Sequence, residues 1–172
     1  MSEQKHDTRP RASRPNIPGY GILDSNSGKG LLPWSWATER LFKAHTYFIG
    51  TTRPDGRPHV MPVWGIWLEG VFYFSSGRNS RKARNLAANP NCVVSIELSG
   101  ESVILEGVAE ETTDNEVLKQ CSVAYTAKYE WEMEANSEPF FAVRPSVVFG
   151  FIENDSLFTS TATRWTFDRD DA

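Results

Sequence analysis

Residues 51–86, TTRPDGRPHVMPVWGIWLEGVFYFSSGRNSRKARNL, carry most of the information about the fold. Residues 46–52 (TYFIGTT), which overlap the start of this stretch, are rich in β-branched and aromatic side chains, which favours a strand. In the following turn, 53–58 (RPDGRP), proline fixes one backbone angle and Asp-Gly suits a tight reversal. The chain is therefore expected to return as a second strand over 59–67. Pro62 within it predicts an edge position or a bulge, because proline donates no hydrogen bond to a neighbouring strand.

A third strand is expected over 71–76, so these segments form an antiparallel meander. The other predicted elements are a helix within 32–45 with Ser35 as its N-cap, a helix capped by Asn79 or Ser80 and ended near Pro90, strands 91–98 and 101–111, a helix over 112–130, and strands 140–153 and 162–168. About seven strands, mostly joined by hairpins, predict a mainly β fold: a β-barrel with peripheral helices. Residues 1–30 are predicted to be a flexible basic arm, and 31–172 the barrel domain.

Composition limits the possible functions. The chain has 172 residues, of which 40% are hydrophobic, enough for one domain with a substantial core. Its net charge of -4 argues against a nucleic-acid partner, since nucleic-acid-binding domains are usually basic. No apolar stretch approaches the roughly 20 residues needed to span a bilayer, and residues 1–16 lack the apolar segment of a secretory signal. We therefore expect a soluble cytoplasmic protein without a membrane partner.

Common catalytic and metal-binding motifs are absent from the sequence. Cys92 and Cys121 form no CxxC pair and are expected to be reduced, buried and inert, so no metal site is predicted. His59 has two interpretations: a solvent-facing strand residue, which is the default, or a ligand contact. Without a nucleophile and its base, an enzyme of this sequence needs a cofactor to carry the chemistry.

The stretch SSGRNSRKARNL (75–86) offers a place for such a cofactor. Backbone N–H groups in the first helical turn lack partners, and the helix dipole adds positive charge there. Ser80, Arg81 and Lys82 at this terminus, with hydroxyls from Ser75 and Ser76, would bind a phosphate. The alternative is that the basic side chains are an ordinary solvated helix face.

Residues 51–97 resemble the pyridoxamine 5'-phosphate oxidase-like family of FMN-binding split barrels. The shared pattern is a strand, the PDGRP hairpin, a strand with PVW, a strand ending in hydroxyl residues, and then SRKARNL and NP. The resemblance implies a split β-barrel that forms homodimers with two cofactor sites at the subunit interface. The cofactor-binding residues that it implies are Val60, Met61, Pro62, Val63, Trp64 and Gly65 along the flavin ring, Ser75, Ser76, Ser80, Arg81 and Lys82 at the phosphate, and Arg164 and Trp165 from the partner chain.

The chain also departs from the true pyridoxamine phosphate oxidases. These carry basic residues at both ends of the flavin strand, where this chain has Val60 and Gly65, and a C-terminal substrate signature that this chain lacks. The PDGRPHVMPVW version is similar to a subgroup that uses the deazaflavin coenzyme F420. The basic arm, with Arg9, Arg11 and Arg14, would suit the polyglutamate tail of that coenzyme.

Three hypotheses follow. The first is an oxidoreductase that binds FMN or F420 and transfers hydride to or from a small organic substrate, with Trp64, Trp67 and Trp165 as candidates to stack on the ring; its catalytic residues are unknown. The second is a flavin- or haem-binding carrier or sensor without turnover, which the lack of an evident acid–base residue keeps open. The third is a structural barrel without a ligand.

Overall fold

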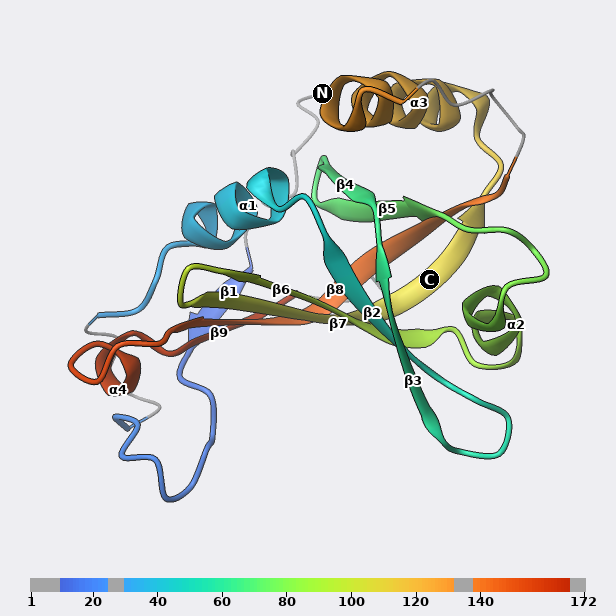
Figure 1. The fold of residues 1–172 in the computed structure, drawn as a ribbon. Coiled ribbons are helices and arrows are strands. Elements are labelled where there is room, and N and C mark those ends of the chain that lie inside the picture. Colours follow the sequence, from blue (N-terminus) through green and yellow to red (C-terminus); the bar gives the residue numbers. More distant parts are fainter. Residues whose placement is uncertain (1–9, 25–29, 132–137, 168–172) are drawn as a thin grey trace, which may run out of the picture.

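The computed structural model describes residues 10–24, 30–131 and 138–167. Within these ranges it contains nine strands: β1 (Arg11–Ser13), β2 (Tyr47–Thr52), β3 (Pro58–Val63), β4 (Gly65–Leu68), β5 (Val71–Ser75), β6 (Asn91–Leu98), β7 (Glu101–Thr112), β8 (Phe140–Ile152) and β9 (Thr163–Thr166). The described helices are α1 (Trp34–Lys43), α2 (Arg81–Ala88), α3 (Asn115–Tyr129) and the short α4 (Phe158–Thr161). The expected mainly β fold with a few helices is thus confirmed (Figure 1).

All strand pairs are antiparallel, and the main path of the sheet runs β1-β9-β8-β7-β6-β2-β3. Strand β8 organises the sheet because it has three partners. It pairs with β7 along one edge, while its other edge pairs with β5 over residues 140–143 and with β9 over residues 147–150. Strands β4 and β5 therefore branch from one half of β8, and β9 with β1 from the other half. The path is open, with β3 at one end and β1 at the other.

The larger hydrophobic cluster lies between the curved sheet and α1, and a second, smaller cluster packs α3 against β4, β5 and β8. Figure 1 shows both helices over the sheet. Alternation along the strands sends every second residue inward, as Val94 and Ile96 of β6 and Val103 and Leu105 of β7 show. Ala37 and Leu41 of α1 are fully buried against this layer. The core is continuous from α1 to the starting turn of α2.

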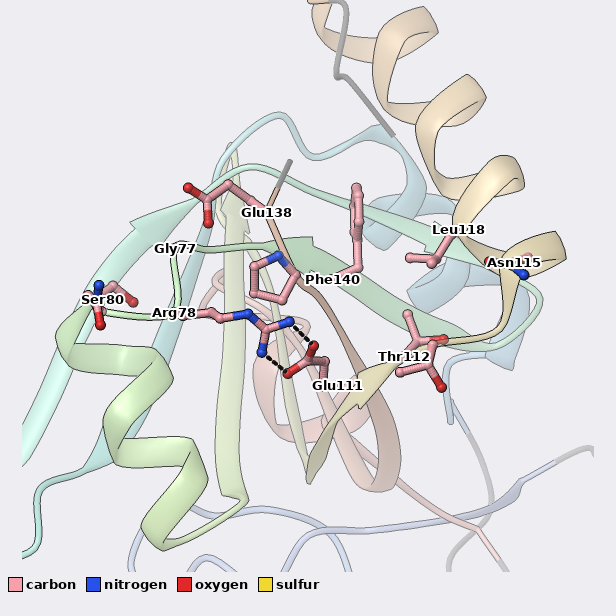
Figure 2. Close-up of a pocket in the computed structure, with 12 residues that line it drawn as sticks. Gly77, Arg78, Ser80, Glu111, Thr112, Asn115, Leu118, Glu138 and Phe140 are labelled. Atoms are coloured by element: carbon pink, nitrogen blue, oxygen red, sulfur yellow. Dashed lines mark hydrogen bonds and ion pairs between the residues drawn. The ribbon is translucent and has the colours of Figure 1, made fainter. Parts of the chain in front are cut away.

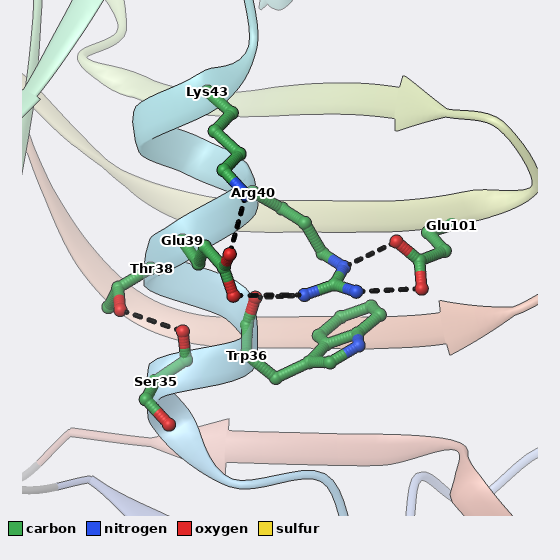
Figure 3. A network of polar contacts seen from close by, with 7 residues as sticks. All are labelled: Ser35, Trp36, Thr38, Glu39, Arg40, Lys43 and Glu101. Carbon is green, nitrogen blue, oxygen red and sulfur yellow. Dashed lines mark hydrogen bonds and ion pairs between the residues drawn. The ribbon is translucent and has the colours of Figure 1, made fainter.

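A bidentate ion pair fixes α1 on the sheet (Figure 3). The Arg40 guanidinium donates two hydrogen bonds of 2.7 Å to the Glu101 carboxylate at the start of β7. The same guanidinium lies 3.9 Å from the centre of the Trp36 ring and donates to the Trp36 carbonyl. Because a bidentate contact fixes direction as well as distance, α1 holds a defined position over the barrel.

The hairpin predicted from RPDGRP is confirmed. The Arg53 N–H donates to the Arg57 carbonyl at 2.9 Å, and Gly56 has a φ of +84°, which a side chain would disfavour. Strand β3 lies at an edge of the sheet, as Pro62 predicts. The single strand expected over 59–67 is wrong in one respect: the chain breaks at Trp64 into β3 and β4.

Two expected boundaries differ from the structure. Helix α1 has Pro33 rather than Ser35 as its N-cap, and no side chain caps it. The helix predicted over 112–130 is α3, which begins after Asp114; this side chain accepts hydrogen bonds from the N–H groups of Glu116 and Val117. Of the two N-caps considered for α2, the structure selects Ser80.

Part of the predicted flexible arm is attached to the sheet. Strand β1 pairs with β9, and Arg14 is 3% exposed and donates to the Ala162 carbonyl at 3.1 Å. This corrects the expectation for Arg14, which is buried against the protein rather than free to meet a cofactor tail. Arg9 lies outside the described residues.

Candidate functional site

The start of α2 gathers hydroxyl groups. Ser80 is the N-cap, and its hydroxyl accepts a hydrogen bond from the Ala83 N–H at 3.1 Å. The Ser76 hydroxyl, at the end of the preceding strand, lies 2.9 Å from that of Ser80. The Ser75 hydroxyl points elsewhere and donates to the Pro139 carbonyl at 3.3 Å. The first turn of α2 contains no acidic residue, so its dipole has no carboxylate of its own.

Two cations follow directly on this N-cap. Arg81 is exposed, whereas Lys82 is half-buried, and burial lowers the pKa of the Lys82 ammonium from its ordinary value. Neither forms an ion pair with a carboxylate among residues 10–24, 30–131 and 138–167. Positive charge at a helix N-terminus is unfavourable by itself, and a partly desolvated lysine adds to that cost. An anion bound there would offset both.

A neighbouring pocket of about 450 Å³ provides a contrast (Figure 2). It lies between the approach to α2 and the start of α3, and Ser80 is on its wall. Its cation, Arg78, is already neutralised by two hydrogen bonds of 3.0 and 2.7 Å to Glu111. Glu138 lines the same pocket. This side of α2 is therefore unsuited to an anion, unlike the turn that carries Arg81 and Lys82.

A polar chain joins α2 to the β2–β3 hairpin. Asn85 is fully buried one turn after Arg81, and its amide donates to the Thr51 hydroxyl at 2.9 Å. The Thr51 oxygen also lies 3.5 Å from the His59 ring nitrogen Nδ1. His59 is consequently linked through Thr51 to the second turn of α2. The pKa of its imidazole is lowered, mainly by partial burial and to a smaller extent by the positive charges of Arg53, Arg81 and Lys82.

Strand β3 supplies an open backbone edge to the same region. Within residues 10–24, 30–131 and 138–167 it pairs with β2 alone, so its other edge offers backbone groups that no described strand pairs with. Beyond β3, Gly65 pairs with Phe74, next to the serines at the end of β5. The β3–β4 junction and the start of α2 are thus neighbouring parts of one surface.

Helix α3 holds that junction in place. The Tyr129 hydroxyl accepts a hydrogen bond from the Gly65 N–H at 2.8 Å and lies 2.7 Å from the Gly65 carbonyl oxygen. The Lys128 ammonium donates to the same carbonyl at 3.1 Å and to the Tyr47 hydroxyl at 2.7 Å. The Trp64 ring stacks on Tyr129 at 4.7 Å and 7°, yet remains 41% exposed. Trp64 is therefore an oriented aromatic surface rather than a core residue.

The predicted cofactor residues fall into two groups. The first surrounds the β3–β4 junction and the start of α2: Val60, Met61, Pro62, Val63, Trp64, Gly65, Ser75, Ser76, Ser80, Arg81 and Lys82. The side chains of Val60, Met61 and Trp64 are exposed, whereas Val63 and Gly65 are buried and present only backbone. The second group, Arg164 and Trp165, is on β9. In the sheet, four strands lie between β9 and β3: β8, β7, β6 and β2.

The structure corrects the prediction for Trp165. Its side chain is 0% exposed and packs against Trp34 and Trp36, with ring centres 5.5 and 6.5 Å away. A ring enclosed in the core of its own chain does not reach a cofactor held by another chain. Trp67 is also a core residue, at 9% exposure, which leaves Trp64 as the accessible one of the three candidate tryptophans. Arg164, its neighbour on β9, faces the opposite side of the sheet and lines a surface groove with Phe149 and Phe151.

The outer face of the sheet is unusually apolar for a surface open to water. Phe48, Val60 and Val93 are 46%, 59% and 38% exposed, and the pairing of Gly50 with both Val60 and Val93 makes them neighbours. They line an open groove of about 530 Å³ across β2, β3, β6 and β7. Exposed apolar surfaces of this kind mark interaction sites.

Both cysteines are free and buried, as predicted. Burial raises the pKa of Cys92 to about 12 and that of Cys121 to about 11, so neither is a ready nucleophile. Among the described residues, no helix is both long and apolar enough to cross a membrane.

With this geometry described, comparison with known proteins decides the family. The sequence profile of the pyridoxamine 5'-phosphate oxidase family matches residues 37–150, more than half of the chain. The chain belongs to this family. The match includes β2 to β7 and α2, and thus all of the α2 surface described above. No curated protein sequence matches the chain.

Solved structures support the fold. A conserved hypothetical protein from Mycobacterium tuberculosis is similar with a TM-score of 0.66 and 19% identity, over 75% of this chain and 90% of that chain. An F420 reductase is similar with a TM-score of 0.53 and 24% identity, over 64% of this chain and 94% of its own. The haem storage protein HutZ from Vibrio cholerae has a TM-score of 0.54 and 16% identity, over 65% and 87%. At these identities the likeness shows the fold alone, which this chain shares with each of the three proteins.

Some residues of this surface were not identified from the sequence. Asn85 and Thr51 link α2 to the hairpin, while Lys128 and Tyr129 fix the β3–β4 junction. One signal was available: Asn85 follows Arg81 by four residues, so both share a helix face. The partners of Tyr129 lie more than 60 positions away in the chain, and no local pattern indicates them.

Proposed function

We propose that the protein is a flavin-type oxidoreductase of the pyridoxamine 5'-phosphate oxidase family that binds FMN or the deazaflavin F420. The observation that carries the proposal is the start of α2. Two cations without a described carboxylate partner, Arg81 and Lys82, lie at the positive end of a helix that has no acidic residue in its first turn. Both cofactors carry a phosphate, which fits this charge.

The residues present fit such a cofactor in three respects. Arg81 and Lys82 would bind the phosphate, assisted by the hydroxyls of Ser76 and Ser80 and the first N–H groups of α2. The open edge of β3 would meet the polar edge of the ring, and Trp64 would pack against the ring or the substrate. When bound, the cofactor supplies the hydride-transfer chemistry, while the chain binds it, orients it and excludes water.

A homodimer would complete the site. The exposed Phe48, Val60 and Val93 form an apolar face beside the proposed ring site, and water would be removed from it in a subunit interface. Four strands separate β9, which carries Arg164, from β3 within one chain, so Arg164 would reach the cofactor only across such an interface. Members of this family typically act as dimers, in agreement with this arrangement.

The proposal is tested by titrating the purified protein with FMN and, separately, with F420, following the visible spectrum and the quenching of cofactor fluorescence. Saturable binding of either cofactor supports the proposal. The reduced cofactor should then be reoxidised faster in the presence of a small conjugated electron acceptor. Failure to bind either compound refutes the proposal.

A haem-binding function is the second candidate, and the similarity to HutZ in fold favours testing it. Haem needs an axial ligand, and the described histidines are His45 and His59. The His45 ring packs 4.9 Å from Tyr129, and His59 lies among cations. Haem added to the same protein would give a Soret band that His45→Ala or His59→Ala removes if this candidate is correct.

A further inference from the structure

His59 lies inside the proposed phosphate region, although it belongs to a different element from Arg81 and Lys82. Thr51 is the link: its hydroxyl oxygen is 3.5 Å from His59 Nδ1 and 2.9 Å from the Asn85 amide nitrogen on α2. Asn85 shares a helix face with Arg81, four residues earlier. The imidazole is therefore linked through Thr51 to the second turn of α2, and the charges of Arg81 and Lys82 in the first turn act on it.

Among the described residues, the charges that act on the His59 imidazole are all positive. From the hairpin comes Arg53, and from α2 come Arg81 and Lys82; these are the charges that act on the imidazole. The acidic residue of the hairpin, Asp55, is engaged with Arg57 through hydrogen bonds of 2.7 and 3.0 Å.

Two buried polar atoms in this region also lack partners among the described residues. One is Arg53 Nε, and the other is Asn85 Oδ1. If the amide of Asn85 were turned over, its nitrogen would be unpaired in place of its oxygen. Buried polar atoms are seldom left unpaired, so these two atoms show that hydrogen bonding in this basic region is incomplete within the described residues.

We propose that His59 is a third phosphate-binding group, which takes up a proton when the cofactor's phosphate binds beside Arg81 and Lys82. This inference rests on the proposed function. Without the anion, burial and then the positive charges of Arg53, Arg81 and Lys82 lower the pKa of the imidazole and so favour its neutral form. A bound phosphate reverses the local charge and stabilises the imidazolium, which then donates to a phosphate oxygen.

The consequence is linkage between cofactor binding and pH. The bound form has the higher histidine pKa, so binding takes up a proton and is tighter at low pH than at high pH. A cofactor without a phosphate would show no such linkage through His59. The pH dependence therefore distinguishes an imidazolium that binds phosphate from a histidine that only supports the strand.

The test is isothermal titration of the full chain with FMN, with riboflavin as the matched ligand that lacks the phosphate. Titrations in two buffers of different ionisation enthalpy give the number of protons taken up. His59→Gln keeps a polar side chain but cannot become charged. His59→Arg carries a permanent charge. F420 replaces FMN in a second arm, since its phosphodiester tests the same site with a different phosphate.

We expect the wild type to take up more protons than His59→Gln when FMN binds. When riboflavin binds, the two proteins should take up the same number of protons. His59→Gln should bind FMN about tenfold more weakly near pH 6 and about as tightly as wild type near pH 8. His59→Arg should restore affinity while removing the steep pH dependence. Equal proton uptake in wild type and His59→Gln, with FMN bound by both, refutes the inference alone. Wild type that binds neither FMN nor F420 refutes the proposed function as well.

Discussion

Replacing Arg81 and Lys82 together by alanine is expected to remove cofactor binding while leaving the fold intact. A hydrogen bond from a charged donor contributes about 1.5 to 3 kcal/mol, so two of them contribute about 3 to 6 kcal/mol. Arg81 is exposed and Lys82 half-buried, which favours the lower end of this range. The expected loss for FMN is therefore about 100-fold or more in affinity.

The assay is quenching of FMN fluorescence during titration, combined with urea unfolding of the variant. The two cations oppose the dipole of α2, so their removal should not destabilise the fold. We expect the free energy of unfolding to change by less than about 1 kcal/mol. Arg84→Ala is the matched control, since Arg84 is an exposed cation on the same helix and should bind FMN as wild type does. A stable double variant that binds FMN as tightly as wild type would show that the phosphate lies elsewhere.

Three further predictions concern the interface, the strand break and the buried lysine. Val93→Glu places a charge on the apolar outer face and should convert the proposed dimer into monomers, measured by light scattering after size exclusion. A side chain at Gly65 would overlap the Phe72 ring, so Gly65→Ala should lower the free energy of unfolding by about 1 to 3 kcal/mol in urea denaturation. Burial lowers the pKa of the Lys128 ammonium from 10.5 to about 8. Between pH 8 and pH 10.5 the folded chain therefore binds fewer protons than the unfolded chain, so the free energy of unfolding increases as the pH rises. Lys128→Met should lack this increase in the free energy of unfolding when unfolding is measured across that pH range. An identical pH dependence in the two proteins would contradict the assignment to Lys128.

Local sequence signals predicted the elements well where the cause was local. Asp55 and Gly56 make the hairpin turn, Ser80 caps α2, and Pro62 lies on an edge strand. Each of these follows from one residue's backbone or hydrogen-bonding preference.

The errors arose where distant contacts decide the structure. The break at Trp64 depends on Tyr129, whose hydroxyl bonds to Gly65 from a helix far along the chain. The attachment of β1 to β9 joins residues about 150 positions apart. A local sequence pattern does not indicate contacts between residues so far apart in the chain.

For Trp165 the necessary signal was present in the sequence. Arg164 and Trp165 are adjacent in a strand, so their side chains point to opposite faces and both cannot line one ligand site. The aromatic residue of such a pair is the one expected in the core. The structure places it there, with Arg164 on the outer face.

Mass spectrometry of the ligand released from the natively purified protein shows directly whether the chain holds a phosphate-bearing flavin or deazaflavin. We expect the mass of FMN or of F420 with its glutamate tail, in roughly one copy per chain, and its loss from the Arg81→Ala/Lys82→Ala variant. Release of haem instead, or equal amounts of flavin from wild type and the double variant, would contradict it.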